Sequence, residues 1–139
     1  YVSPFTAPRF ANLKARMFGV WGNNDGDRNQ LAKPYSLNGA EIRGLFAELG
    51  LGGLTIALLH GHEEELLHSL IRSRGYDVVV CGHTHQPVLK REGETLLLNS
   101  GEVCAYLTQK STFGLIDTDA GRISIVEASS GKMFRDISL

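Results

Sequence analysis

This chain of 139 residues has few cysteines, no long apolar run and no excess of charge of one sign. Its two cysteines, Cys81 and Cys104, are too few for a disulfide framework. We therefore expect a reducing, cytoplasmic setting. Each cysteine could be a metal ligand or a nucleophile, but each lies by an apolar stretch, which favours a small buried hydrophobe over these roles and over half of a disulfide. No apolar run approaches the ~20 residues of a membrane-spanning helix, and no basic stretch followed by an apolar one marks a signal peptide. The sequence thus predicts no membrane partner.

Charge is balanced, with 14 basic and 15 acidic residues and a formal net charge of −1. This balance argues against a strongly basic nucleic-acid binder and against a disordered acidic tail. The length suits one domain over residues 1–139. Glycine is plentiful, at 16 residues, and many glycines follow short apolar runs, as expected where strands end in tight turns.

The apolar pattern predicts a strand-rich α/β fold with antiparallel hairpins in its second half. The clearest helix spans 63–74, with three glutamates in its first turn, an apolar stripe and Gly75 as its stop. His68 lies off this stripe, so we expect a solvated surface histidine. Segment 42–49 favours a strand, although it also has helical spacing. The other expected elements are a short helix over 4–13, strands over 15–21, 54–59 and 77–81, and two hairpins, 88–91 with 94–98 and 112–118 with 122–127.

Three of the expected strands end in polar residues that can bind metal. In chain order, the motifs that follow these strands are Gly22-Asn23-Asn24-Asp25, His60-Gly61-His62 and Gly82-His83-Thr84-His85. In open α/β sheets functional residues collect beyond the carboxyl ends of the strands, so we expect the motifs to converge on one site. Imidazoles and an Asn carbonyl suit divalent transition metals. If the backbone there is extended, His83 and His85 project from the same side, toward one metal or two.

Each motif also has an ordinary structural explanation. His60 alone would be a hydrogen-bonded core histidine, His62 a residue at a helix start, and 23–26 a simple turn. The three motifs together favour a metal site over these explanations. Other metallohydrolase patterns fit less well: Gln86-Pro87 stand where a metallo-β-lactamase-like site needs Asp and His, and 62–66 lacks the second histidine of a zincin.

The order Gly-Asn-x-Asp, His-Gly-His and Gly-His-Thr-His resembles the calcineurin-like metallophosphoesterase superfamily, and within it the small prokaryotic phosphodiesterase branch. Segments 99–102, 104–108 and 114–118 are similar to the C-terminal half of that branch. The resemblance implies an αββα sandwich that holds two divalent metals, commonly Mn, with Ni, Fe, Zn or Mg as alternatives. It also implies that Asn23, His60 and His83 hold one metal, that His85 belongs to the other, and that a bridging hydroxide attacks phosphorus in line.

One departure from the family pattern concerns the leaving group. Many relatives have a histidine after the Gly-Asn that protonates the leaving alkoxide, and here that position is Asn24. An amide has no useful acidity, so we expect Asn24 to contact substrate and esters with good leaving groups to react best. His62 is the candidate for a substitute catalytic acid.

A second departure lies upstream of Gly22, where the family's Asp-x-His and Gly-Asp motifs find no match. We therefore expect the first strand–helix–strand unit of the sandwich to be missing from this chain. The four candidate ligands are all neutral, so we expect these residues alone to bind at most one metal weakly and to turn over little or no substrate. Uncovered sheet edges would also favour association of copies into a homo-oligomer.

The sequence thus predicts a metal-dependent phosphodiesterase that acts on a small phosphate ester. The alternative is a non-catalytic protein-interaction scaffold on the same fold, as in the retromer subunit that resembles this family. Retention of the histidine motifs favours the enzyme, because a scaffold has no physical need for them.

Overall fold

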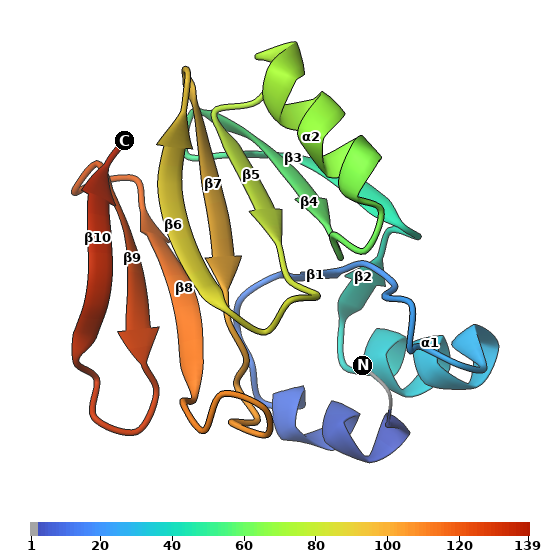
Figure 1. The fold of residues 1–139 in the computed structure, drawn as a ribbon. Helices are drawn as coiled ribbons and strands as arrows, with labels where there is room; N and C mark the ends of the chain where they lie inside the picture. The colour runs from blue at the N-terminus through green and yellow to red at the C-terminus, as the bar shows by residue number, and fades with distance from the viewer. Residues whose placement is uncertain (1–2) are drawn as a thin grey trace.

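The computed structural model describes residues 3–139, which form a mixed α/β fold with three sheets (Figure 1). The elements are η1 (Pro4–Phe10, a 3₁₀ helix), β1 (Met17–Gly19), α1 (Arg28–Leu37), β2 (Ala40–Ile42), β3 (Phe46–Leu51), β4 (Leu54–Leu59), α2 (Glu64–Ser73), β5 (Val78–Cys81), β6 (Pro87–Glu92), β7 (Thr95–Ser100), β8 (Thr112–Asp117), β9 (Arg122–Glu127) and β10 (Met133–Ser138).

A five-stranded sheet in the order β3-β4-β5-β7-β6 forms the centre of the molecule. Its inner strands β4, β5 and β7 are parallel, and the hairpins β3/β4 and β6/β7 add an antiparallel strand at each edge. Strands β8, β9 and β10 form a separate antiparallel sheet, and β1 pairs with β2 in parallel. The parallel centre places the carboxyl ends of β4, β5 and β7 at the same edge.

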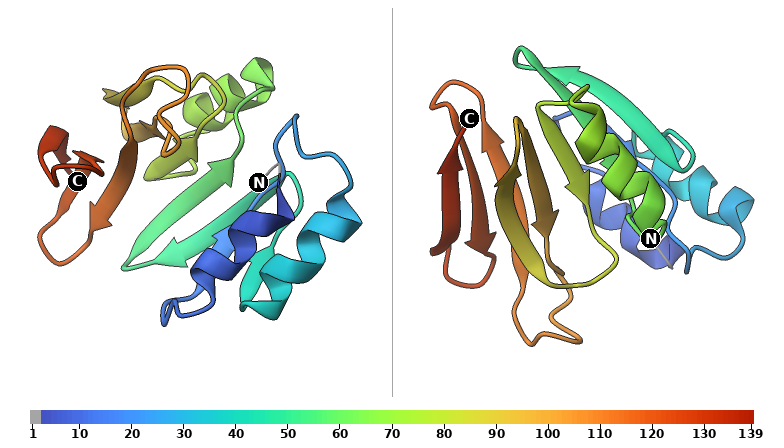
Figure 2. Two further views of the ribbon diagram at one scale, coloured as in Figure 1. Left: turned by 90° about the horizontal axis from the view of Figure 1, so that it is seen from below. Right: turned by 45° about the horizontal axis from the view of Figure 1, so that its top comes forward.

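The two larger sheets pack face to face, and α2 covers the opposite face of the five-stranded sheet (Figures 1 and 2). Strand β5 shows why: Val78 belongs to the core between the sheets, and Val79 to the core under α2, because successive side chains point to opposite faces. The predicted α/β fold class is confirmed. Residues 3–139 form three layers of the predicted sandwich: α2 and the two larger sheets. Helices η1 and α1 pack with β2 in a separate cluster around Tyr35.

Helix α2 and the central hairpins form where the sequence predicted them. The helix carries glutamates in its first turn and buries Ile71 against the sheet. Its left-handed terminal residue is Arg74 (φ 54°), so the expectation that Gly75 would provide this turn is wrong by one position. The ambiguous segment 42–49 is strand rather than helix, divided between the end of β2 and the start of β3.

Two N-terminal predictions need correction. The expected helix over 4–13 is a 3₁₀ helix that ends at Phe10, and Pro8 inside it has no N–H to donate to an α-helical hydrogen bond. The expected strand over 15–21 pairs only at Met17–Gly19. Trp21 instead donates its backbone N–H to the carbonyl of Gly44, at 2.7 Å, and its side chain is buried.

Helix α1 and strand β10 are absent from the predictions. Helix α1 contains Pro34 and buries only Leu31 and Tyr35, so its periodic signal is weak. Its sequence signal is the N-cap, because Asp27 Oδ1 accepts the backbone N–H of Gln30 at 3.0 Å. Strand β10 is an edge strand whose side chains are nearly all exposed, so it lacks the alternation of a half-buried strand.

The core between the sheets provides a stability test at Ile125 of β9, which is fully buried there. We expect Ile125→Val to lower the free energy of unfolding by about 0.5–1.5 kcal/mol, because it removes one methylene from a packed interior. Leu115→Val on β8 removes one methylene from a side chain that is 50% exposed, and we expect less than about 0.5 kcal/mol. Urea denaturation of both variants checks the contrast, and equal losses would contradict this core.

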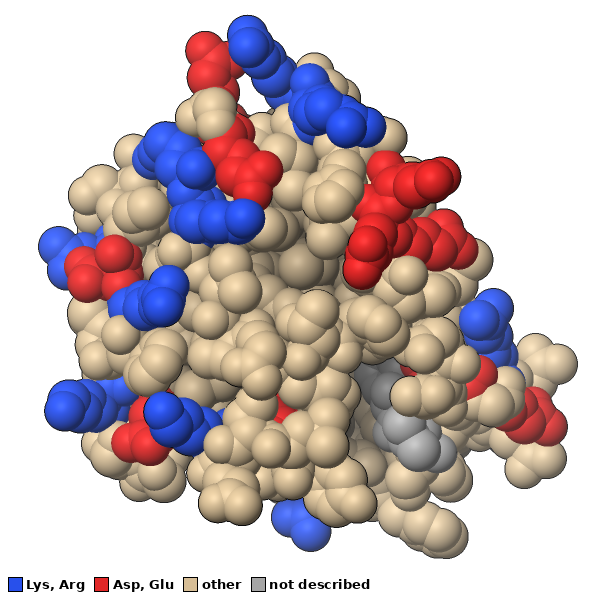
Figure 3. Space-filling view, viewed as in Figure 1, with Lys and Arg blue, Asp and Glu red and all other residues tan. Residues whose placement is uncertain are grey.

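Acidic and basic side chains are interspersed over the face shown in Figure 3, in keeping with the balanced net charge. The densest acidic group lies near α2, whose first turn carries Glu64 and Glu65. None of the helices formed by residues 3–139 combines the length and the hydropathy that crossing a membrane requires.

Candidate functional site

The sheet topology brings the polar motifs together. Strands β4 and β5 run parallel with Leu58 opposite Val80, so His60 and Gly82 leave the sheet side by side, and Gly82 N–H donates to the His60 carbonyl at 2.9 Å. Strand β7 runs parallel to β5, which brings the segment after Ser100 to the same edge. The expected convergence of strand ends is therefore present in the structure.

His60 is at the centre of the candidate site. Its ring centroid lies 5.2 Å from that of His83 and 5.5 Å from that of His62. Its Nε2 lies 2.8 Å from Oδ1 of Asn23, which arrives from the loop after β1. Gly22 permits this approach, because a Cβ there would lie 3.1 Å from the His60 ring. The Asn23 carbonyl oxygen and the His60 imidazole, both candidate ligands, thus face each other.

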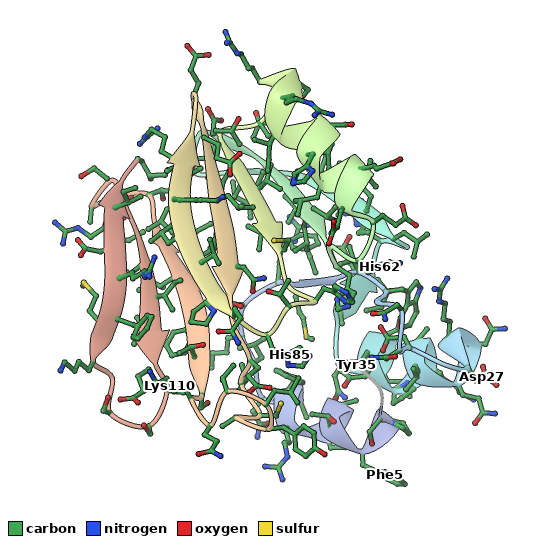
Figure 4. All side chains as sticks on the ribbon, viewed as in Figure 1. Phe5, Asp27, Tyr35, His62, His85 and Lys110 are labelled. Carbon is green, nitrogen blue, oxygen red and sulfur yellow. The ribbon has the colours of Figure 1, made fainter. Side chains whose placement is uncertain are left out.

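A cleft of about 380 Å³ opens beside these residues. Its walls combine polar groups from all three motifs with two apolar side chains: Val20, Gly22, Asn24, Asp25, His60, His83, His85 and Leu107. Asn24 is exposed and lines the cleft, as the prediction of a substrate contact requires. Figure 4 shows His85 on the loop between β5 and β6, and His62 close to the start of α2.

The backbone carrying His83 and His85 is not extended, so the condition under which both side chains would project from the same side is not met. Both residues adopt positive φ, 68° and 61°, a left-handed conformation that costs a non-glycine residue roughly 1–2 kcal/mol. Asn99 stabilises this loop: its Nδ2 donates to the Gly82 carbonyl at 2.7 Å and to Thr84 Oγ1 at 3.0 Å. Such strain concentrates at functional sites, where surrounding contacts hold the residues in place.

The electrostatics favour a neutral imidazole at His60. Burial of the ring lowers the pKa of His60, and the neighbouring His83 and His62 lower this pKa further. The Asp25 carboxylate acts in the opposite direction, while its Oδ2 accepts the Gly22 N–H at 2.6 Å. Because a histidine must be deprotonated to bind metal, a lowered pKa keeps His60 in its ligand form at neutral pH.

His62 lies beside the cleft rather than in its wall. It lines a small adjoining pocket with Leu45 and Leu59, and its ring centroid is 6.1 Å from that of His83. Its Nδ1 is buried and has no hydrogen-bond partner, and its Nε2 lies 3.9 Å from Glu63 Oε1. The surface position expected for His68 is confirmed, because this residue is exposed on α2.

The donor set fits a divalent metal in kind but is incomplete. Imidazole nitrogens and an amide oxygen are suitable ligands for such ions. Within residues 3–139, no three His, Cys, Asp or Glu side chains are grouped closely enough to hold one ion between them. Asn24, His60, His83 and His85 thus line one cleft, Asn23 contacts His60 beside it, and the donor atoms are of the kind that divalent metals bind.

A buried acid beside the cleft received no functional role from the sequence. Glu102 follows β7, and its Oε2 lies 2.8 Å from His85 Nδ1. Burial raises the pKa of Glu102, but hydrogen bonds from Thr108, His85 and Cys104 outweigh this effect and lower the pKa to about 2. The carboxylate is therefore ionised at neutral pH. The sequence does contain a signal for Glu102: it is an acid placed just after β7, a strand that ends beside the histidine loops.

The two cysteines differ in their surroundings. Cys81 is buried at the end of β5, and desolvation raises the pKa of its thiol to about 11, so it packs as an inert hydrophobe. Cys104 is exposed, which corrects the expectation that both are buried, and its Sγ lies 3.3 Å from Glu102 Oε2. Both thiols are free.

Comparisons with known proteins agree with this arrangement. Residues 1–121 match the family described as the calcineurin-like phosphoesterase superfamily domain. Phosphodiesterase MJ0936 of Methanocaldococcus jannaschii is 38% identical over 120 residues, which cover 86% of this chain and 72% of that protein. The solved structure of an archaeal phosphodiesterase superposes with a TM-score of 0.76 at 33% identity, covering 99% of this chain and 78% of that one. Vacuolar protein sorting 29 from Cryptosporidium parvum shares the fold, with a TM-score of 0.65 at 18% identity and coverage of 99% and 78%.

Proposed function

Because the chain belongs to the calcineurin-like phosphoesterase superfamily, we propose that it provides part of a site that hydrolyses small phosphate diesters with the help of divalent metal ions. The observation that carries the proposal is the gathering of His60, His83 and His85 around one cleft, with the Asn23 carbonyl oxygen 2.8 Å from His60 Nε2. The relationship to MJ0936, a protein named as a phosphodiesterase, supports the choice of diesters.

In this proposal Asn23, His60 and His83 hold one metal ion, and His85 belongs to a second. Bound ions would lower the pKa of water and offset the negative charge that develops on the phosphoryl oxygens. Mn is our first choice, because a neutral amide oxygen among imidazoles suits it. The lowered pKa of His60 supports its role, because it favours the uncharged ring that a ligand histidine needs.

Asn24 in the cleft wall and His62 beside the cleft are the proposed contacts to the ester. Asn24 is exposed in the cleft wall, where its amide N–H can donate to a phosphoryl oxygen. It cannot protonate a leaving alkoxide, so we propose that the preferred diesters carry good leaving groups. His62 is our candidate proton donor, because its ring lies beside those of His60 and His83, with centroid separations of 5.5 and 6.1 Å.

The charges of the proposed ligands limit what this chain can hold. All four are neutral, so two divalent ions would bring four positive charges without a carboxylate among their ligands. We therefore expect the 139 residues to bind at most one Mn²⁺ weakly and to show little or no turnover. Isothermal titration with Mn²⁺ and metal analysis after dialysis test this expectation, and two tightly held ions would contradict it.

Hydrolysis of bis-p-nitrophenyl phosphate tests the function itself. It should be assayed with added Mn²⁺ and with a chelator, for the 139 residues and for the whole protein that its gene encodes. We expect metal-dependent hydrolysis from the encoded protein. A complete lack of activity in both, with Mn²⁺ still not bound, would instead support the non-catalytic scaffold.

The setting and association of the protein are also proposals. Two free thiols, one of them exposed, support a reducing, cytoplasmic setting. Exposed apolar side chains, including Phe5 at 86% and Leu37 at 78%, support association of copies into a homo-oligomer.

A further inference from the structure

We propose that Glu102 is a positioning residue that fixes the tautomer of His85, so that Nδ1 carries the proton and Nε2 keeps its lone pair for a metal ion. The role of His85 as a ligand rests on the proposed function. The tautomer itself does not, because it follows from contacts within the chain.

The contact between the two side chains determines where the proton lies. Glu102 is buried, with only 3% of its side chain exposed, and its Oε2 lies 2.8 Å from His85 Nδ1. An ionised carboxylate can only accept hydrogen bonds, so Nδ1 must donate. In a neutral ring this leaves Nε2 unprotonated. His85 is 38% exposed and lines the cleft, which gives the ring access to an ion there.

The second oxygen of Glu102 is committed to a different partner. Its Oε1 accepts the backbone N–H groups of Leu107 and Thr108, at 2.8 and 2.5 Å, and the Thr108 hydroxyl at 2.8 Å. These bonds hold the loop that places Leu107 in the cleft wall. A residue that only anchored this loop would need one oxygen, whereas Glu102 uses the other for His85.

This division makes Glu102→Gln an informative substitution. The loop side presents two backbone N–H groups and a hydroxyl to Oε1, so the amide oxygen of glutamine should take that place. The amide nitrogen then faces His85 Nδ1 and can only donate to it. We therefore expect the His85 ring to change to the tautomer with its proton on Nε2, which cannot bind a metal through that atom.

Nitrogen-15 NMR of the imidazole rings of the metal-free chain at pH 8 reads the tautomer directly. We expect the Nδ1–H form of His85 in the wild type and the Nε2–H form in Glu102→Gln. Thr108→Val is the matched control: it removes one hydrogen bond from Oε1 and leaves the carboxylate, so the Nδ1–H form should persist.

Two results would overturn the proposal: an Nε2–H wild-type His85, or a Glu102→Gln variant that keeps Nδ1–H. If the variant does not fold, the wild-type spectrum still decides between the tautomers. Metal binding is a separate measurement, made on the protein that the gene encodes, in which we expect Glu102→Gln to lower the affinity for an ion at His85 by about 10–100-fold. If no variant binds metal while the tautomers behave as expected, the proposed function fails and the positioning role of Glu102 stands.

Discussion

Replacing His83 by alanine should reduce metal-dependent hydrolysis of bis-p-nitrophenyl phosphate by at least about 100-fold, because a lost ligand removes several kcal/mol of charge stabilisation. The affinity for Mn²⁺ should fall by at least about tenfold, since even partners of ligands contribute that much. His83 is exposed, so its removal should cost the fold little. Initial rates and isothermal titration provide the measurements, on the encoded protein if the 139 residues are inactive.

His68→Ala is the matched control for this substitution. It removes the same side chain from the exposed surface of α2, so neither the rate nor the Mn²⁺ affinity should change. Thermal unfolding of both variants separates loss of metal from loss of fold. Hydrolysis that survives His83→Ala unchanged would contradict the proposed metal centre.

In a His62→Ala background, Asn24→His should raise the hydrolysis of diesters with an alkyl leaving group by about 10²–10⁴-fold, the usual contribution of a positioned general acid. Asn24 is exposed in the cleft wall, so an imidazole there can reach a bound ester. Diesters that release p-nitrophenolate need little protonation, and their rate should change by less than about threefold. The ratio of the two rates is therefore the quantity to measure.

The same experiment tests His62 as the present proton donor. If His62 already supplies the proton, His62→Ala should slow the alkyl diester more than the p-nitrophenyl diester, and Asn24→His should restore the alkyl rate. An alkyl rate that responds to neither substitution would contradict general acid catalysis from this side of the cleft.

The sequence predicts the centre of the fold and the gathering of the histidines well. Short β-branched runs such as Val78–Val80 are buried on both faces, so they indicate inner strands, and the polar residues after parallel strands must share an edge. This logic brings His60 and His83 together before any coordinates are known. It fails for helix α1, whose apolar face is too narrow to give a clear period.

Local backbone geometry and charge partners are harder to predict. The left-handed conformations of His83 and His85 depend on tertiary hydrogen bonds, among them those from Asn99 to the Gly82–Thr84 turn. Glu102 is one acid among 15 in the sequence, and its hydrogen bonds to the loop at Thr108 form only in the folded chain. Sequence patterns report burial and period, whereas these features depend on packing.

The most direct test of the proposed metal centre is a titration with Zn²⁺, a diamagnetic ion, followed through the imidazole nitrogens of all five histidines. We predict that His60 Nε2 and one ring nitrogen of His83 shift together at the first additions, with the Asn23 side-chain amide, while His68 does not move. Shifts of His60 and His83 that saturate at different Zn²⁺ concentrations, or a response from His68 alone, would contradict a shared ion.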